Sequence, residues 1–259
     1  MRVVVGIEYD GTEFCGWQSQ QGSRTVQDEV QKALSYVANE EIQVSCAGRT
    51  DSGVHAYGQV IHFDTSVQRS ERSWVLGCNS NLPKDINISW AKETESDFHA
   101  RFGATSRRYR YVIMNRFTRS AILQNRVCWH HQPLDVSRMQ EAAQHFIGEH
   151  DFTSFRALAC QAKHAIRTMH ILNLHRQGDY IFIDVQANAF LHHMVRNIVG
   201  TLLAIGEGEE DPAWVKSLLA AKDRSAAGIT SSAQGLYLVS VQYPDKFAIP
   251  GVELPPGFV

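Results

Sequence analysis

Residues 2–28 read RVVVGIEYDGTEFCGWQSQQGSRTVQD and define the first strand, turn and helix of the chain. Valine and isoleucine dominate residues 2–9, which predicts a strand because β-branched side chains fit a pleated surface. Asp10-Gly11-Thr12 is typical of a turn. Thr25 is expected to cap a helix, because apolar residues follow it at helical spacing, namely Val26, Val30, Ala33, Leu34 and Val37.

Similar patterning extends to residue 92. Strands are expected over residues 42–46, 59–65 and 86–92, with a helix over residues 71–79. With the first strand and helix they give the order β-α-β-β-α-β. That order predicts a ferredoxin-like, or RRM-like, half in which helices cover one face of an antiparallel sheet.

The second part of the chain repeats this scheme with larger insertions. We expect strands at 107–114, 127–131, 167–175, 180–187 and 236–241, and helices at 135–147, 190–205 and 212–221. Residues 250–259 contain three prolines and are expected to be irregular. The predicted fold class is α+β, with two ferredoxin-like halves (residues 1–100 and 101–259) that share a continuous, mainly antiparallel sheet with a central basic cleft.

Composition argues against several classes of protein. The 259 residues are 44% hydrophobic and 20% charged, as in soluble globular proteins, and no apolar run reaches the ~18 residues that a membrane helix needs. Glu8 interrupts the N-terminal apolar stretch, which is therefore expected to be a strand and not a signal peptide. The five cysteines are scattered without a C-x-x-C pair, which disfavours disulfides and zinc knuckles and favours a cytoplasmic protein.

The charge distribution is more informative than the net charge of −2, which alone argues against a nucleic-acid binder. Residues 101–126 contain seven arginines and no acid. Residues 152–178 contain Arg156, Lys163, Arg167 and Arg176, again without an acid. A solvated surface is one interpretation, but two long acid-free runs rich in the planar donor fork of arginine favour contact with phosphates.

The densest group of candidate catalytic residues is Gly48-Arg49-Thr50-Asp51-Ser52-Gly53-Val54-His55-Ala56. Asp-Ser-Gly alone is a competent turn. In an extended segment, however, Arg49 and Asp51 project from the same side with Cα atoms ~7 Å apart. An ion pair at that spacing would keep the carboxylate ionised and oriented, so Asp51 is the candidate catalytic residue.

Arg107-Arg108-Tyr109-Arg110-Tyr111 is a second candidate motif. In a strand, Tyr109 and Tyr111 face one way while Arg108 and Arg110 face the other. Buried tyrosines beside surface arginines explain this pattern structurally. Interleaved aromatics and arginines also suit a flipped-out base and its phosphate.

The third motif spans residues 188–200, where a helical apolar stripe is expected. On that helix His192 and Arg196 would be i,i+4 neighbours. We expect no metal site, because His192 and His193 would diverge on a helix and no H-E-x-x-H spacing exists. Arg196 is a candidate anchor for phosphate or carboxylate, with a surface ion pair as the alternative.

Residues 150–156, HDFTSFR, are expected to form a loop. A Ser-His-Asp hydrolase site is disfavoured because no G-x-S-x-G elbow is present. Thr153, Ser154 and Arg156 could contact phosphate, while the two phenylalanines could simply pack in the core. No G-x-G-x-x-G or G-x-x-x-x-G-K-S/T motif occurs in the required context, so we expect no nucleotide cofactor.

Together these motifs, with residues 9–18 (YDGTEFCGWQ) and 234–238 (QGLYL), resemble the bacterial tRNA pseudouridine synthase A (TruA) family over nearly the whole chain. Ser52 departs from the family, where Ala is common. Residues 229–233 also lack a Pro-Ala pair that many members carry, which leaves the contacts of that loop in doubt.

The resemblance implies two ferredoxin-like halves, a basic cleft, a homodimer spanned by one tRNA, and no cofactor or metal. It implies isomerisation of uridine to pseudouridine at tRNA positions 38, 39 and 40, in the anticodon stem-loop. Asp51 would attack C1′ or C6, or remove the C2′ proton, after the nucleotide flips out. Tyr109 would stack on the base, Arg49 would orient Asp51, and Arg196 would be the cleft arginine. Further candidates for RNA contact are His55, Arg107, Arg108, Arg110, Ser154 and Arg156.

A different class, a noncatalytic RNA-binding protein built from paired RRM-like halves, is the main alternative. Such a protein needs exposed aromatics on its central strands in the K/R-G-F/Y-G/A-F-V-x-F/Y pattern, which the sequence lacks.

Overall fold

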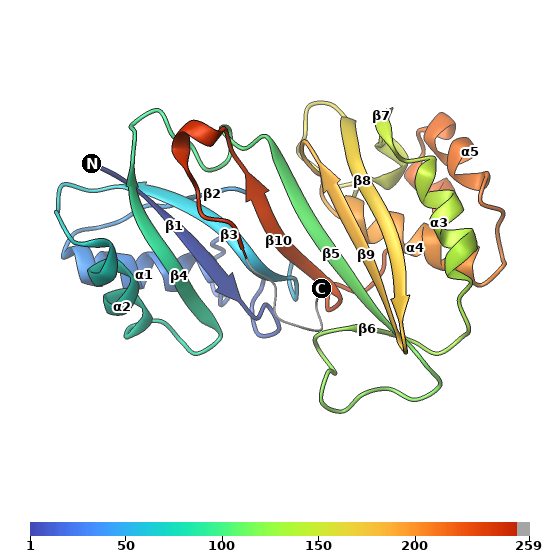
Figure 1. Ribbon diagram of the computed structural model, residues 1–259, viewed down its shortest axis with the longest axis horizontal. Helices are drawn as coiled ribbons and strands as arrows, with labels where there is room; N and C mark the ends of the chain where they lie inside the picture. The colour runs from blue at the N-terminus through green and yellow to red at the C-terminus, as the bar shows by residue number, and fades with distance from the viewer. Residues whose placement is uncertain (253–259) are drawn as a thin grey trace. The chain divides into compact units, whose positions relative to one another are not determined.

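The computed structural model describes residues 1–252, and contacts divide them into two compact units (Figure 1). The first unit consists of Met1–Ser106 together with the chain from Tyr237 onward, and the second consists of Arg107–Leu236. Both units combine helices with mainly antiparallel strands, and the described residues include five α-helices. The predicted α+β class is therefore confirmed. None of these helices is both long enough and apolar enough to cross a bilayer.

The first unit is built on three long antiparallel strands, β1 (Arg2–Tyr9), β3 (His55–Asp64) and β4 (Ile86–Thr94). The strand β1 lies between the other two, so that Val5 pairs with Ile61 on one side and with Ala91 on the other. The short β2 (Ser45–Cys46) extends the sheet beyond β3. The strand β10 (Leu236–Gln242) comes from the far end of the chain and runs parallel to β3.

Two helices cover one face of this sheet, α1 (Val26–Ala38) and α2 (Glu71–Asn79). The helix α1 begins where the sequence predicts, because the Thr25 hydroxyl accepts a hydrogen bond from the Asp28 amide. Trp74 of α2 packs edge-on against Phe63 of β3, with ring centroids 5.2 Å apart. The buried, regularly spaced apolar side chains of α1 thus form the core that their periodicity predicts.

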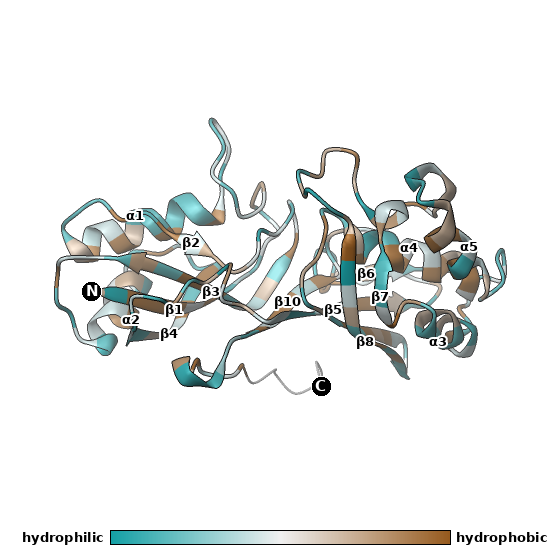
Figure 2. Ribbon diagram, turned by 90° about the horizontal axis from the view of Figure 1, so that it is seen from above, coloured by the Kyte–Doolittle hydropathy of each residue, from teal (hydrophilic) through white to brown (hydrophobic). Residues whose placement is uncertain are grey.

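Irregular segments cover the opposite face of the same sheet. They are residues 95–105 and residues 243–252, the latter interrupted by a 3-10 helix at Asp245–Phe247, and Figure 2 shows residues 243–252 on the side of the sheet away from α1. The Tyr243 hydroxyl donates to the Ala100 carbonyl over 2.7 Å, and Phe98 contacts the rings of both Tyr243 and Phe247. Residues 250–252 are irregular, as predicted, whereas the prediction for residues 253–259 lies outside the described residues.

The second unit contains a sheet in the order β5-β9-β8-β7, with β6 parallel to β5. Its strands are β5 (Ser106–Asn115), β6 (Cys128–His130), β7 (Gly148–Asp151), β8 (Ile166–Gln177) and β9 (Tyr180–Ala187). Its helices are α3 (Val136–Gln144), α4 (Met194–Gly206) and α5 (Trp214–Ala221). Asp135 caps α3 by accepting hydrogen bonds from the amides of Ser137 and Arg138.

The predicted helix over residues 190–205 is wrong at its beginning. Helix α4 starts at Met194, because His193 adopts a left-handed conformation with φ of 61° and caps the helix through its carbonyl, which accepts from the Asn197 amide. His192 and His193 therefore precede the helix, and the prediction that His192 and Arg196 lie one turn apart on a helix is wrong. The ring centroids of His192 and His193 lie 4.0 Å apart, so the two side chains do not diverge as neighbours on a helix would.

Several other boundaries also differ from the prediction; α3, for example, ends at Gln144 instead of residue 147. The strand β3 begins at His55 instead of residue 59, and only Ser45 and Cys46 of the predicted strand 42–46 pair with it. Residues 148–151 form β7, so His150 and Asp151 of the predicted loop 150–156 belong to a strand. These four residues, GEHD, lack any apolar alternation and become a strand through their pairing with β8.

Candidate active site

Asp51 lies in the turn that connects β2 to β3 in the first unit. The Val54 amide donates to the Asp51 carbonyl over 3.1 Å, which closes the turn. Gly53 occupies the position with φ of 78°, a left-handed conformation that favours glycine. The Asp51 side chain is half-buried at the head of this turn, so its carboxylate is held by the fold and is still reachable by a substrate.

Buried hydrogen bonds fix both sides of the segment that carries Asp51. Gln59, fully buried on β3, donates to the Gly48 carbonyl over 2.6 Å and accepts from the Gly48 amide. The Thr50 hydroxyl bonds the Tyr9 hydroxyl over 2.7 Å, and the Thr50 carbonyl accepts from the Trp17 amide over 3.0 Å. Thr50 therefore anchors the turn, a role that the sequence pattern had not indicated.

A second loop supports the turn from behind. Gly16 has φ of 85°, and a Cβ placed on it would stand 2.7 Å from the Thr50 carbonyl oxygen. The Ser52 hydroxyl donates to the Phe14 carbonyl over 3.1 Å. The close backbone approach requires glycine at position 16, and it sets the position of the Asp51 turn against the loop that follows β1.

Arg49 does not make the ion pair with Asp51 that the spacing suggests. Its side chain is exposed, and within residues 1–252 no ion pair joins the two side chains. It lies close enough to Cys46, with Arg101, that both cations lower the pKa of that thiol. Burial outweighs them and raises the pKa of Cys46 to about 11, so this thiol is a poor nucleophile.

His55 holds the loop after β1 in place. It is buried, with its ring stacked on Tyr237 at a centroid distance of 4.7 Å. Its Nδ1 accepts from the Gly11 amide over 3.0 Å, which requires the proton to be on Nε2 in the neutral ring. Nδ1 also lies 3.1 Å from an Asp10 carboxylate oxygen, but a nitrogen that accepts from Gly11 cannot donate there. This geometry gives His55 a structural role.

The second unit presents Tyr109 and two neighbours on one face of β5. Arg107 donates to the Asn188 carbonyl over 3.0 Å, and the Tyr111 hydroxyl donates to the Ser232 carbonyl over 2.7 Å. Tyr109 is 7% exposed and meets Phe190 edge to face, with centroids 5.0 Å apart and an interplanar angle of 83°. Complete burial raises the pKa of Tyr111 well above its usual value, so its phenol is a fixed hydrogen-bond donor and not an acid.

Arg108 and Arg110 point to the other face of β5, as the strand alternation predicts. Both reach Asp184 of β9, Arg108 at 3.2 Å and Arg110 through two bonds of 3.0 and 2.6 Å. Arg110 is buried, whereas 38% of the Arg108 side chain remains exposed. Arg110 therefore has a structural role, whereas part of the Arg108 side chain remains exposed to solvent.

Arg196 lies in the first turn of α4. Its Nε donates to the Ser231 carbonyl over 2.8 Å, while the Ser231 amide donates back to the Arg196 carbonyl over 3.1 Å. The loop that contains Ser231 crosses α4 closely, because a Cβ on Gly200 would stand 1.7 Å from the Ile229 carbonyl oxygen. The loop thereby fixes one end of the Arg196 guanidinium.

A buried amide next to Arg196 organises the same region and was not predicted. Asn197 is fully buried and donates to the Phe155 carbonyl over 2.8 Å. Its oxygen accepts from Thr230 over 2.6 Å and from Arg224 over 3.1 Å. These partners are 27 to 42 residues away in the sequence, so no local pattern could have indicated them.

A short 3-10 helix (Thr153–Phe155) follows β7. Ser154 lies within it, and Arg156 comes directly after it. Ser154 is fully buried, where its hydroxyl donates to the Leu218 carbonyl over 2.6 Å and accepts from the Asp223 amide over 2.9 Å. Arg156 is half-buried, and its side chain makes a single long contact within residues 1–252, 3.5 Å to the Ala162 carbonyl. Ser154 thus serves the fold, and Arg156 is the better candidate for phosphate.

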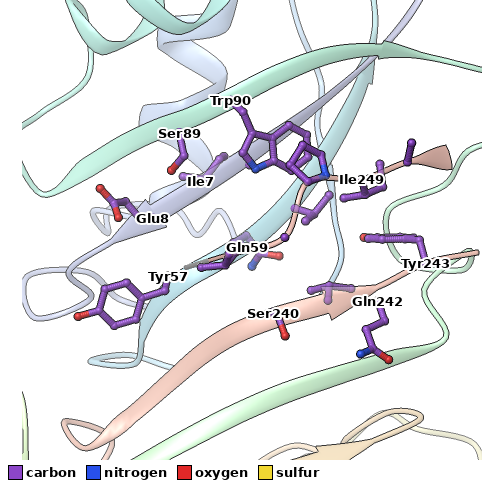
Figure 3. Close-up of a pocket in the computed structure, with 18 of the residues that line it drawn as sticks. Ile7, Glu8, Tyr57, Gln59, Ser89, Trp90, Ser240, Gln242, Tyr243 and Ile249 are labelled. Carbon is purple, nitrogen blue, oxygen red and sulfur yellow. The ribbon is translucent and has the colours of Figure 1, made fainter. Parts of the chain in front are cut away.

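A separate hollow of about 740 Å³ lies in the first unit (Figure 3). Its floor includes Gly6, whose backbone is covered by the ring of Trp90, and Gly58. Glu8 and Asp245 are the charged side chains that line its described part, and no lysine or arginine does. A phosphate would find no counter-charge there, so this hollow is unsuited to RNA.

Comparisons with known proteins identify related sequences over the full chain. A family model described as tRNA pseudouridine synthase matches residues 6–103 and 142–244. A protein named tRNA pseudouridine synthase A from Vibrio campbellii is 55% identical over 259 residues, which is 100% of this chain and 98% of that one. A protein of the same name from Shewanella frigidimarina is 56% identical over 259 residues, which is 100% of this chain and 99% of that one. A protein of that name from Nitrosococcus oceani is 55% identical over 255 residues, 98% of each chain. A solved Cbf5-Nop10-Gar1 complex superposes with a TM-score of 0.42 at 11% identity, over 91% of this chain and 48% of that one, a likeness too distant to bear on the fold.

Proposed function

The chain belongs to the tRNA pseudouridine synthase family and isomerises uridine to pseudouridine in tRNA, and we propose that Asp51 carries out this chemistry. The observation that supports this assignment is the half-buried carboxylate on a turn anchored by Thr50, Gln59 and Gly16. A reacting group must be both accessible and held in place. We further propose positions 38, 39 and 40 of the anticodon stem-loop as the targets.

The reaction rearranges one nucleotide without adding or removing atoms overall. The bond between N1 and C1′ breaks, C5 joins C1′, C5 loses its proton and N1 gains one. Asp51 can serve in three ways, by attacking C1′, by attacking C6, or by removing the C2′ proton. All three routes need a carboxylate that reaches the ribose or the base edge, so the nucleotide must leave its stack.

Tyr109, Arg196 and Arg49 have proposed roles in holding that flipped nucleotide. Tyr109 stacks on the uracil ring, with Phe190 fixing the tilt of the tyrosine ring. Arg196, whose Nε donates to the Ser231 carbonyl, contributes positive charge for a phosphate of that nucleotide. Arg49 is exposed, which favours contact with the RNA backbone over orientation of Asp51.

The other candidates for RNA contact divide by their surroundings. Arg108 and Arg156 keep exposed or weakly engaged guanidinium groups, so we retain them as phosphate contacts. His55, Arg107, Arg110 and Ser154 make buried or partly buried hydrogen bonds to the protein, which supports structural roles. The proposed RNA surface is therefore narrower than the sequence alone suggests.

We also propose that the chain is built from two ferredoxin-like halves, residues 1–100 and 101–259. In the first unit, the antiparallel order β4-β1-β3-β2 and the chain order β-α-β-β-α-β match that fold. The family resemblance supports a shared sheet, a basic cleft between the halves, and a homodimer that binds one tRNA across both subunits. The cytoplasm, where tRNA is modified in bacteria, is the proposed location.

Release of tritium from tRNA labelled at uridine C5 tests the assignment. Asp51→Asn keeps the size of the side chain and removes its charge, and we expect it to lower the rate of release by about 10³-fold or more. Asp97→Asn is the matched control, since Asp97 pairs with Lys246 on the surface of the first unit and should leave the rate unchanged. Fluorescence anisotropy with tRNA checks that the Asp51→Asn variant still docks its substrate.

Two results would contradict the proposal. Equal release by Asp51→Asn and wild type would remove Asp51 from the chemistry. No release by wild type from any unmodified tRNA that it binds would favour a noncatalytic RNA-binding protein.

A further inference from the structure

The connection between β5 and β6 is an unusual segment of the second unit. The two strands run parallel, with Ile113 paired to Cys128 and Asn115 to His130. Parallel neighbours need a crossover, which is usually a helix. Here residues 116–127 form an irregular loop that extends beyond the sheet of its unit, in green in Figure 1.

The composition of this loop, RFTRSAILQNRV, combines positive charge with exposed apolar side chains. It contains three arginines and no acid. Phe117 is 85% exposed and Ile122 is 87% exposed. Folded proteins rarely keep large apolar side chains this exposed on one short segment unless a partner covers them.

Hydrogen bonds hold the base of the loop. The Trp129 indole donates to the Arg116 carbonyl over 2.9 Å, and the Asn115 amide donates to the carbonyls of His130 and Gln132 over 3.1 and 2.6 Å. Within the loop, the Leu123 amide donates to the Ser120 hydroxyl over 3.1 Å. These hydrogen bonds give the loop a defined conformation in which Phe117 and Ile122 are exposed.

The arginines of the loop are not equivalent. Arg116 folds back onto the loop, donating to the Thr118 carbonyl over 2.8 Å and approaching Asp179 at 3.7 Å. Arg119 is exposed, and its guanidinium donates to no protein group in residues 1–252. Arg119 thus carries an available positive charge two residues from Phe117.

We propose that residues 116–126 form an RNA-docking loop, in which Phe117 stacks on an unpaired base and Arg119 contacts a phosphate. An aromatic ring offers a sequence-tolerant surface to any base, and a neighbouring cation neutralises the backbone. The absence of acid from this stretch favours a polyanionic partner over a protein with a mixed surface. The inference rests on the proposed function only in that tRNA is taken as the RNA.

Binding of unmodified tRNA, measured by anisotropy between roughly 50 and 200 mM salt, tests this loop. Phe117→Ala should raise Kd about 10-fold, the effect of losing one stacked base. Arg119→Gln should weaken binding and reduce the slope of log K against log salt by about 1. The controls are Tyr36→Ala, a 73% exposed aromatic on α1, and Arg72→Gln, an exposed arginine on α2, and both should bind as wild type.

A photo-crosslinking residue, p-benzoylphenylalanine at position 117, identifies the partner directly. An adduct with tRNA supports the loop as an RNA contact, whereas an adduct with a second protein chain, or none, overturns it. Unchanged Kd and salt slope in both Phe117→Ala and Arg119→Gln would also overturn it. Failure here is distinct from failure of the proposed function, because wild type would still release tritium from C5-labelled tRNA.

Discussion

Gly16→Ala should displace the Asp51 turn without altering any group that reacts. The added Cβ would stand 2.7 Å from the Thr50 carbonyl oxygen and 3.1 Å from both the Asp51 carbonyl carbon and the Ser52 nitrogen. All three atoms belong to the backbone of the Asp51 turn, so no side chain can rotate away. Cβ contacts closer than 3.0 Å are essentially never seen, so the two loops must separate by about 0.3 Å or more.

Gly16→Ala should lower both the stability of the protein and its kcat. The left-handed conformation at φ of 85° costs an alanine roughly 1–2 kcal/mol, and overpacking adds typically about 1–3 kcal/mol. A displacement of about 1 Å in a reacting group can lower a rate ~10²-fold. A shift of a few tenths of an ångström should therefore lower kcat by roughly 3- to 10-fold.

Gly22→Ala is the matched control for this experiment. Gly22 has φ of 76°, close to that of Gly16, but no atom lies within 4 Å of its added Cβ. Gly22→Ala should therefore carry the same energetic cost of a left-handed alanine as Gly16→Ala, but its kcat should equal that of wild type. Single-turnover tritium release at saturating tRNA measures the rate, and urea denaturation measures the free energy of unfolding. If the two alanine variants showed the same kcat, the claim that Gly16 positions Asp51 would be refuted.

Two further predictions concern buried charges. Asp184→Asn should lower the free energy of unfolding, measured by urea denaturation, by about 3–5 kcal/mol, because it leaves the buried Arg110 uncompensated. The double variant with Arg110→Leu and Asp184→Leu should lose much less stability. Additive losses of stability in the double variant would contradict this explanation. Burial lowers the pKa of His62 to about 4, and the neighbouring His99 and Arg2 act in the same direction. The unfolded chain therefore binds this proton more tightly than the folded protein does. The free energy of unfolding should then fall as the pH drops from about 6.5 to 4. His62→Asn keeps an acceptor for the Ala100 amide and should flatten that fall; an unchanged pH profile would show that His62 does not cause it.

The sequence predicted those elements whose side chains alternate or repeat along the chain. Periodic apolar residues identified β1 and α1, and Thr25 marked the start of that helix, because each signal is local. The strand β7 had no such signal, since its four residues are strand only through pairing with β8. The left-handed conformation of His193 is also unusual for a non-glycine residue, and nothing in the adjacent sequence predicts it.

The contacts that hold the candidate site in place could not be predicted from the sequence. Asp51 stood out because several chemically active residue types cluster around it. Its anchor, the bond between Tyr9 and Thr50, joins residues 41 apart, and the ion pair between Arg110 and Asp184 spans 74. Local spacing favoured Arg49 as the partner of Asp51, whereas the fold holds the turn through the neutral side chain of Thr50.

If positions 38, 39 and 40 are the targets, as proposed above, one carboxylate must serve three adjacent uridines, and the neutral anchor of the Asp51 turn bears on how it does so. The hydrogen bonds and backbone contacts that fix the turn, from Trp17, Tyr9 and Gly16, all lie within the first unit and involve no RNA-facing charge. The backbone position of Asp51 should then be the same whichever uridine is bound. On the proposed function, each target must be brought to this carboxylate by movement of the RNA, and exposed side chains such as Arg49 and Arg119 can follow the phosphates without disturbing the turn. A substitution at either arginine should therefore change the relative rates at positions 38, 39 and 40, whereas Gly16→Ala should lower all three in proportion.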